Sequence, residues 1–193
     1  VLALALVGGA YVATRAHVAP SALTGNPALR YNVRQLTAEP GVEWFPSISP
    51  DGDWVVYAGT GPEGRDIFLR AVGGQNVINL TADAPEDDDQ PAFSPAGDRI
   101  AFRSERDGGG LFVMARTGEG VRRLSRFGYR PTWSPDGREL AFATENVELN
   151  PQNANAYSEL WVLTVSTGEL RRIEPVADAV VPSWSPGGAR IAY

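Results

Sequence analysis

The stretch Pro131-Thr132-Trp133-Ser134-Pro135-Asp136-Gly137 decides how the rest of the chain is interpreted. It indicates a short β-strand that runs into a tight turn, because proline presets φ for the first central turn position and Asp-Gly tolerates the angles that follow. The same pattern starts at Pro46, Pro91 and Pro182. These lead prolines are 45, 40 and 51 residues apart, and a repeat of about 40–45 residues is typical of propeller blades.

Each of the first three repeats continues with three more apolar segments, separated by short polar loops. After Gly137 these segments are 139–143, 160–163 and 170–173. Four short antiparallel strands make one blade, whereas a β-sandwich, the main alternative, does not predict one heptapeptide recurring at a fixed place. We therefore predict an all-β propeller of four-stranded antiparallel blades within residues 33–193. The predicted blades span 45–81, 90–125, 130–173 and, truncated, 181–193.

The propeller is expected to be incomplete in this chain. The 193 residues hold three repeats and about half of a fourth, and a complete propeller has about 4–8 blades. The chain also starts without Met and ends within a strand at Tyr193, which suggests a segment of a longer protein. Residues 33–37 match the fourth strand of a blade without its first three, so we assign them to a blade that the chain lacks.

The N-terminal residues 1–14 are apolar and uncharged, and the first charge is Arg15. Because a membrane-spanning helix needs about 20 apolar residues, we interpret this apolar helix as the C-terminal part of a transmembrane span. The apolar core of a signal peptide and a buried helix of a soluble domain are the alternatives. Residues 15–32 are predicted to be a tether, and His17, the only histidine, is interpreted as a solvated residue of it.

Several functional classes find no support in the sequence. The net charge is −6 and all seventeen basic residues are arginines scattered among acids, so nucleic acid is not an expected partner. There is no cysteine, no G-x-S-x-G motif, no kinase motif and no P-loop. We therefore expect no catalytic residue, no cofactor and no metal site in this chain.

The candidate binding residues lie near the lead prolines. Connections between blades and between second and third strands are expected on one face, and recognition usually lies on such loops. We predict a mixed polar and aromatic ligand or partner face there, made of Glu43, Trp44, Asp89, Tyr129, Arg130 and Asp178.

Three other features of the sequence bear on function. The run 86–89 could help to hold a hard cation, but it lacks calcium-loop spacing and is interpreted as a solvated acidic loop, with Asp89 alone facing a central channel. The loop 146–158 has a length typical of functional or disordered loops. The aromatic residues at repeated strand positions are interpreted as packing between blades. They are Phe93, Phe102, Trp133, Phe142, Trp161 and Trp184.

The repeats resemble those of the periplasmic Tol-system protein TolB and its relatives. That family shows P-x-W-S-P-D-G, then I-A-F, then an I-Y-V-M-type strand and R-L-T, and the resemblance covers 33–193. It implies the fold strongly and the function weakly, because similar blades occur in many different proteins. Ala96 and Gly187 replace the family's Asp, but the following glycine remains, so we expect both turns to form.

Residues 104–114 and 181–186 resemble the C-terminal propellers of bacterial membrane-anchored Ser/Thr protein kinases, and winged-helix regulators with similar tails look alike here. This resemblance implies an extracytoplasmic, periplasmic sensor or protein-interaction propeller. Its loop face would contact a protein or small-molecule ligand, and its N-terminal helix would contact the membrane. Two alternatives remain: a periplasmic TolB-like protein of the envelope or transport system, and the propeller of a prolyl-oligopeptidase-like peptidase.

Overall fold

The computed structural model describes residues 33, 35–37, 41–145, 157–174 and 178–193. The predicted segments 1–14 and 15–32, and most of the loop 146–158, lie outside these residues. In the described part of the chain, no helix is long and apolar enough to cross a membrane. The chain divides into two units, Val1–Gln35 and Leu36–Tyr193, and every described strand belongs to the second.

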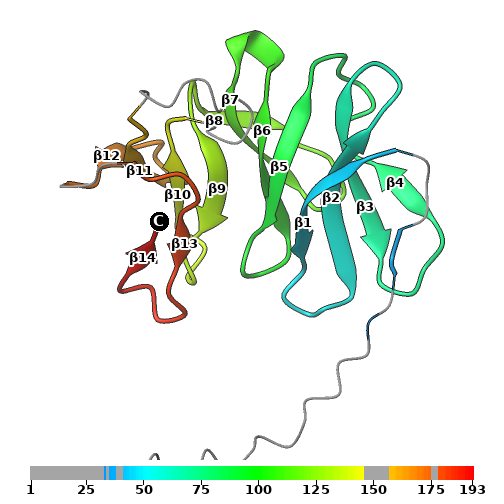
Figure 1. Ribbon diagram of the computed structural model, residues 1–193, viewed down its shortest axis with the longest axis horizontal. Coiled ribbons are helices and arrows are strands. Elements are labelled where there is room, and N and C mark those ends of the chain that lie inside the picture. Colours follow the sequence, from blue (N-terminus) through cyan, green and yellow to red (C-terminus); the bar gives the residue numbers. More distant parts are fainter. Residues whose placement is uncertain (1–32, 34, 38–40, 146–156, 175–177) are drawn as a thin grey trace, which may run out of the picture. The chain divides into compact units, whose positions relative to one another are not determined.

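The second unit consists of antiparallel sheets whose strands follow chain order (Figure 1). The first sheet contains β1 (Glu43–Ile48), β2 (Trp54–Thr60), β3 (Arg65–Ala71) and β4 (Val77–Asn79). The second contains β5 (Asp88–Phe93), β6 (Arg99–Ser104), β7 (Gly110–Ala115) and β8 (Arg122–Ser125). The third contains β9 (Tyr129–Trp133), β10 (Glu139–Ala143), β11 (Leu160–Thr164) and β12 (Leu170–Arg172). A last pair contains β13 (Ser183–Trp184) and β14 (Ile191–Ala192).

The prediction of four-stranded antiparallel sheets is confirmed. One short 3-10 helix, η1 (Arg106–Gly108), lies in the loop between β6 and β7, and it is the sole helical element of the described residues. The described residues of 33–37 form no strand, and their assignment to a blade that the chain lacks stays a prediction.

The Pro-Asp-Gly turns form for the reasons that the sequence suggests. Gly52 has a φ of +79°, in the left-handed region where a side chain is strained. The Ser49 hydroxyl accepts the Trp54 N–H at 2.9 Å and donates to the Asp51 carboxylate at 2.5 Å. The same carboxylate accepts the Asp53 N–H at 3.0 Å, so the side chains hold the turn at several points.

The two turns that lack the aspartate keep the same backbone, as expected. Gly97 and Gly188 have φ of +72° and +71°. In the turn with Ala96, the carboxylate of Asp98 takes over and accepts a hydrogen bond from the Ser94 hydroxyl at 2.8 Å. The missing acceptor is thus replaced from two residues further along the chain.

Successive sheets pack face to face, and the predicted aromatic residues lie between them. Phe102 packs against the first sheet and Phe142 against the second, both fully buried. The indole of Trp133 on β9 donates to the Ala92 carbonyl on β5 at 3.0 Å. Trp184 repeats this contact with the Thr132 carbonyl at 3.2 Å. The packing interpretation of these residues is confirmed, although Trp161 and Trp184 are only half-buried.

Candidate recognition site at the inner strands

The inner strands β1, β5, β9 and β13, the first of each sheet, lie side by side (Figure 1). In β1, β5 and β9 the pairing register shifts just before the lead proline. At each shift the residue preceding that proline has a positive φ: +52° at Phe45, +54° at Gln90 and +55° at Arg130. Such backbone strain is usual at functional sites, and a bulge re-aims the side chain that it carries.

These strained residues and the lead prolines line one cavity of about 170 Å³. Each of the four repeats contributes the same pair of residues, the one before the proline and the proline itself. We call this the pre-proline cavity. Its lining is Phe45, Pro46, Gln90, Pro91, Arg130, Pro131, Val181 and Pro182. The wall is therefore mostly apolar, and Gln90 and Arg130 supply its polar side chains.

Gln90 and Arg130 are fixed by each other and by their neighbours. The Gln90 side chain is buried, and its Oε1 accepts the Arg130 N–H at 2.7 Å. Gln90 Nε2 is buried and has no hydrogen-bond partner among the described residues. The Arg130 guanidinium lies 4.0 Å from the centroid of the Phe45 ring, in a cation–π contact.

The acidic run 86–89 overlaps the start of β5 and is only partly the solvated loop that we predicted, with Asp89 as the stated exception. Glu86 is exposed, but Asp88 and Asp89 are 0% and 4% exposed. Asp88 pairs with Arg106 at 2.5 Å, and Asp89 lies 3.5 Å from Arg65 Nε. The interpretation was wrong for Asp88, because Arg106 is distant in sequence and reaches this carboxylate only in the folded chain.

Burial sets the protonation behaviour of these two carboxyls. Burial raises the pKa of Asp88 above its usual range, although the Arg106 guanidinium opposes the shift. Burial also raises the pKa of Asp89, against the opposing charges of Arg65 and Arg130. Burial therefore disfavours the charged form of both groups, and their arginine partners only partly offset this effect.

The structure brings only part of the predicted rim together. Arg130 lines the pre-proline cavity, and Asp89, whose Oδ1 accepts the Gln90 N–H at 2.8 Å, lies beside it. Glu43 and Trp44 instead line a different pocket of about 200 Å³ on the first sheet. Glu43 is exposed and accepts a hydrogen bond from the Thr37 hydroxyl. It lies three residues before Pro46, whereas Arg130 lies directly before Pro131, so the two do not occupy equivalent places in their repeats.

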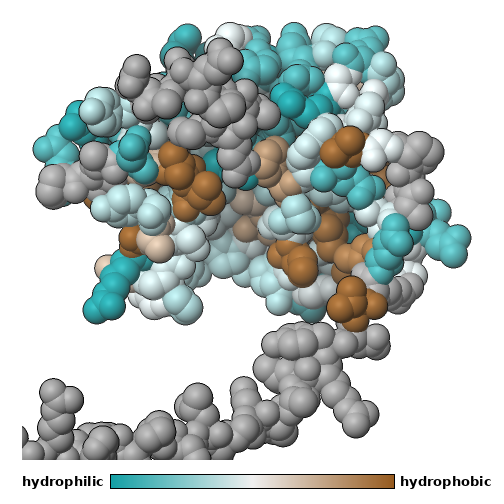
Figure 2. All heavy atoms as spheres, viewed as in Figure 1, coloured by the Kyte–Doolittle hydropathy of each residue, from teal (hydrophilic) through white to brown (hydrophobic). Residues whose placement is uncertain are grey.

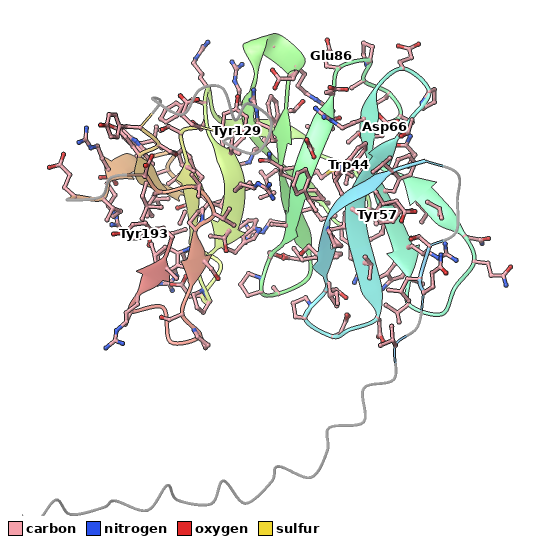
Figure 3. The ribbon with its side chains drawn as sticks, viewed as in Figure 1. Trp44, Tyr57, Asp66, Glu86, Tyr129 and Tyr193 are labelled. Atoms are coloured by element: carbon pink, nitrogen blue, oxygen red, sulfur yellow. The ribbon has the colours of Figure 1, made fainter. Side chains whose placement is uncertain are left out.

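The other two predicted rim residues also lie outside the cavity lining. Tyr129 is half-buried, and the Arg103 guanidinium lies 4.8 Å from the centroid of its ring. Asp178 is exposed, with a φ of +61°. Figure 3 shows Trp44 and Tyr129 at separate places along the inner strands.

Sequence reasoning missed Phe45 and Gln90 as cavity residues. The signal was present, because each occupies the position immediately before a lead proline that Arg130 and Val181 occupy in their repeats. Within the residues that the structure describes, no group of three acidic or histidine side chains is placed to hold a metal ion. In the space-filling view the upper edge, where the β2–β3 and β6–β7 loops lie in Figure 1, is mostly hydrophilic (Figure 2).

Residues 28–193 match the family model described as TolB beta propeller domain. The chain belongs to the TolB β-propeller family. The four-stranded sheets are therefore blades of a TolB-type propeller.

This TolB-type propeller is similar to parts of two curated peptidases. It is 32% identical over 152 residues to dipeptidyl-peptidase 5 of Porphyromonas gingivalis, a match that covers 69% of the chain and 21% of that protein. It is 26% identical over 137 residues to the uncharacterized peptidase YuxL of Bacillus subtilis, covering 53% of the chain and 21% of that protein. The chain thus spans about a fifth of the length of each of these relatives.

Solved structures show the same fold. The crystal structure of TolB from Acinetobacter baumannii superimposes with a TM-score of 0.67 at 24% sequence identity, covering 82% of this chain and 39% of that one. At this identity the likeness concerns the fold alone.

Proposed function

We propose that this TolB-type propeller is a non-catalytic recognition module whose binding surface is the pre-proline cavity and the loops around it. The observation that carries the proposal is the repeated positive φ at Phe45, Gln90 and Arg130, all of which line one cavity. Three strained residues at equivalent places each cost about 1–3 kcal/mol, and such strain is usually retained where it serves a site. Because Phe45, Gln90 and Arg130 carry different side chains, each repeat would offer a different contact to a ligand.

The setting that we propose is an extracytoplasmic sensor of a membrane-anchored signalling protein, of the bacterial Ser/Thr protein kinase type. Support comes from the resemblance of residues 104–114 and 181–186 to such propellers and from the apolar segment 1–14. In this arrangement a single span places the blades in the periplasm, where they contact a protein or small-molecule ligand. The ligand biases the effector only if its affinity differs between two states of the receptor.

A second candidate is the propeller of a prolyl-oligopeptidase-like peptidase. The similarity to dipeptidyl-peptidase 5 and to YuxL favours it. The propeller would then stand beside a hydrolase domain and admit its substrates. The family match equally supports a periplasmic TolB-like protein of the envelope or transport system. The neighbouring domains separate the three settings, since only the first has a kinase and only the second a hydrolase.

The recognition surface can be tested by photo-crosslinking in cells. Val181, which lines the pre-proline cavity, and Ile78, on the outer strand β4, are 48% and 47% exposed. They form a matched pair for placing a photoreactive amino acid. We expect a discrete crosslinked partner from position 181 and none from position 78. Equal labelling from both positions, or a partner only from position 78, would contradict the proposed surface.

The compartment is tested separately. Protease added to intact spheroplasts should digest the propeller while cytoplasmic proteins survive. Protection of the propeller together with the cytoplasmic markers would rule out the sensor setting. It would not bear on the recognition surface, which the crosslinking experiment tests.

A further inference from the structure

The first sheet has an apolar face that points away from the second sheet. Val56 and Ala58 of β2 pack towards the second sheet, so Tyr57 between them points the other way. There it stacks on Phe68 of β3, its partner in register, with the ring centroids 5.8 Å apart. Ile48 of β1 lies on the same face by its register with β2. We call the surface of these three residues the outer aromatic face.

The same aromatic pair recurs in the next two sheets, where it packs on the sheet before it. In the second sheet the pair is Phe102 and Phe112, which are buried in the cluster shared with the first sheet. In the third sheet it is Phe142 and Trp161, which pack in the cluster shared with the second. Tyr57, Phe102 and Phe142 each follow their lead proline by eleven residues. The outer aromatic face therefore repeats two faces that each contact a preceding sheet.

Ile48 occupies a position that is part of the interface in other repeats. Trp133 and Trp184, each two residues after a lead proline, donate to a carbonyl of the preceding sheet. The acceptors are Ala92 and Thr132, each one residue after the preceding lead proline. Ile48 is also two residues after its lead proline, yet it is 63% exposed, whereas Trp133 is 7% exposed. This exposed apolar side chain indicates a surface of the kind that a preceding sheet covers.

Leu36 provides a second link between this face and a preceding sheet. Leu80, directly after β4, belongs to the cluster shared by the first and second sheets. Leu124 of β8 packs in the same way against the cluster shared by the second and third. Each of these leucines ends the Leu-Thr or Leu-Ser pair of a fourth segment, as Leu36 does in its own stretch. Leu36 lines a cavity of about 200 Å³ together with Tyr57, so it lies where the end of a preceding sheet is expected.

We infer that the outer aromatic face docks a further four-stranded blade of the same polypeptide, whose fourth strand ends at Leu36. A second copy of this chain fits less well. In the part of the chain that the structure describes, the aliphatic faces of all three four-stranded sheets already pack on the sheet that follows. Because adjacent repeats place their pre-proline residues side by side, the docked blade adds its own beside Phe45 and extends the pre-proline cavity. The inference goes beyond the proposed function, since the docking holds whether or not that cavity binds a ligand.

The inference is tested by photo-crosslinking within the full-length protein that carries this chain. A photoreactive amino acid replaces Ile48, and the crosslinked peptides are identified by mass spectrometry. By analogy with Trp133, we expect an intramolecular product at the residue after the lead proline of a repeat outside residues 1–193. Ile78, which is 47% exposed on the outer strand β4, is the matched control and should not give this product. A product with a second copy or with an unrelated segment, no product from position 48, or the same product from position 78 overturns the inference.

Thermal unfolding of the full-length protein gives a second readout. A charge buried under a docked blade is unfavourable, so Ile48→Asp should lower the unfolding midpoint by at least about 5 °C. Ile78→Asp should stay within about 2 °C of the parent, as expected for an exposed position. If Ile48→Asp does not fold while Ile78→Asp does, the result supports the same conclusion. A parent-like midpoint for Ile48→Asp overturns the inference.

A tryptophan variant removes the remaining ambiguity about the geometry. Ile48→Trp places at this position the residue found at Trp133 and Trp184, and it should unfold at or above the parent midpoint. A large loss of stability in Ile48→Trp would mean that the partner does not dock as the described sheets do, and it would overturn the inference. The proposed recognition surface is tested separately, because photo-crosslinking of an outside partner from Val181 does not depend on position 48.

Discussion

The two ends of the inner strands β1, β5 and β9 differ in how they accommodate a positive φ. At the turn end, a glycine occupies every position of positive φ, as at Gly52 and Gly137. At the pre-proline end, Phe45, Gln90 and Arg130 adopt a positive φ of similar size with full side chains. A left-handed conformation is nearly free for glycine but strained for other residues. The chain therefore removes strain where only a turn is needed and keeps it where side chains converge on a cavity.

The acidic residues at the two ends differ in the same way. At the turn end, hydrogen bonds from serine hydroxyls lower the pKa of Asp51 and of Asp136. At the pre-proline end, burial raises the pKa of Asp88 and of Asp89. The surroundings of Asp51 and Asp136 thus favour the charged form of the carboxyl, whereas those of Asp88 and Asp89 disfavour it. Asp51 and Asp136 thus form hydrogen bonds that support the turns, whereas burial opposes the ionisation of Asp88 and Asp89.

The largest expected effect concerns neither end but the packing between them. Trp133 is buried between the second and third sheets and donates to the Ala92 carbonyl at 3.0 Å. Trp133→Ala should lower the free energy of unfolding by about 3–5 kcal/mol, because it leaves a large cavity. Trp133→Phe, which keeps an aromatic ring but loses the hydrogen bond, should cost much less. Denaturant unfolding measures both, and a loss below about 1 kcal/mol for the alanine variant would show that this residue is not a packing residue.

The second-largest expected effect comes from backbone strain at two positions, Arg130 in β9 and Gly137 in the turn that follows β9. Gly137→Ala should destabilise the protein by about 1–2 kcal/mol, because alanine is strained at the φ of +70° found there. At the other end, Arg130→Gly should be more stable than Arg130→Ala by about 1 kcal/mol, since both lose the same interactions and differ mainly in the strain at +55°. Denaturant unfolding of the three variants gives these differences. An alanine variant at position 130 as stable as the glycine variant would mean that the positive φ there is not a source of strain.

The sequence predicts most of the fold because the repeat is local. Each Pro-Asp-Gly heptapeptide determines a strand and a turn from neighbouring residues, so the strands follow from short-range signals. Even the substitution at Ala96 is compensated within two residues, by Asp98. The aromatic positions also follow, because Phe102 and Phe142 recur at one place in the repeat and must bury against the adjacent sheet.

The candidate site is less predictable, because its parts meet only in space. The pairing of Asp88 with Arg106 and of Asp89 with Arg65 joins residues 18 and 24 positions apart, across loops that the sequence does not place. The left-handed backbone at Gln90 contradicts the preference of a residue before proline for extended conformations. Only the alignment of the four pre-proline positions could have indicated Phe45 and Gln90, and that alignment does not reveal a cavity.

The smallest and most specific effect is the pH dependence of stability at the two ends. Because the pKa of Asp88 is raised above its reference value of 3.8, the folded state binds more protons than the unfolded state between that value and the raised pKa. The free energy of unfolding contributed by Asp88 therefore falls as the pH rises through this window. Because the pKa of Asp136 is lowered, its contribution is present above 3.8 and is lost as the pH falls towards the lowered pKa.

The two contributions can be isolated by subtraction. Denaturant unfolding between about pH 3 and pH 7 is compared for the parent, Asp88→Asn and Asp136→Asn proteins, with both asparagines unable to titrate in this range. The stability difference between parent and Asp88→Asn should decrease with rising pH, whereas that between parent and Asp136→Asn should increase. If the Asp88 difference also increases with pH, the Arg106 ion pair outweighs burial. The acids at the two ends would then behave alike, and the contrast between the ends would rest on backbone strain alone.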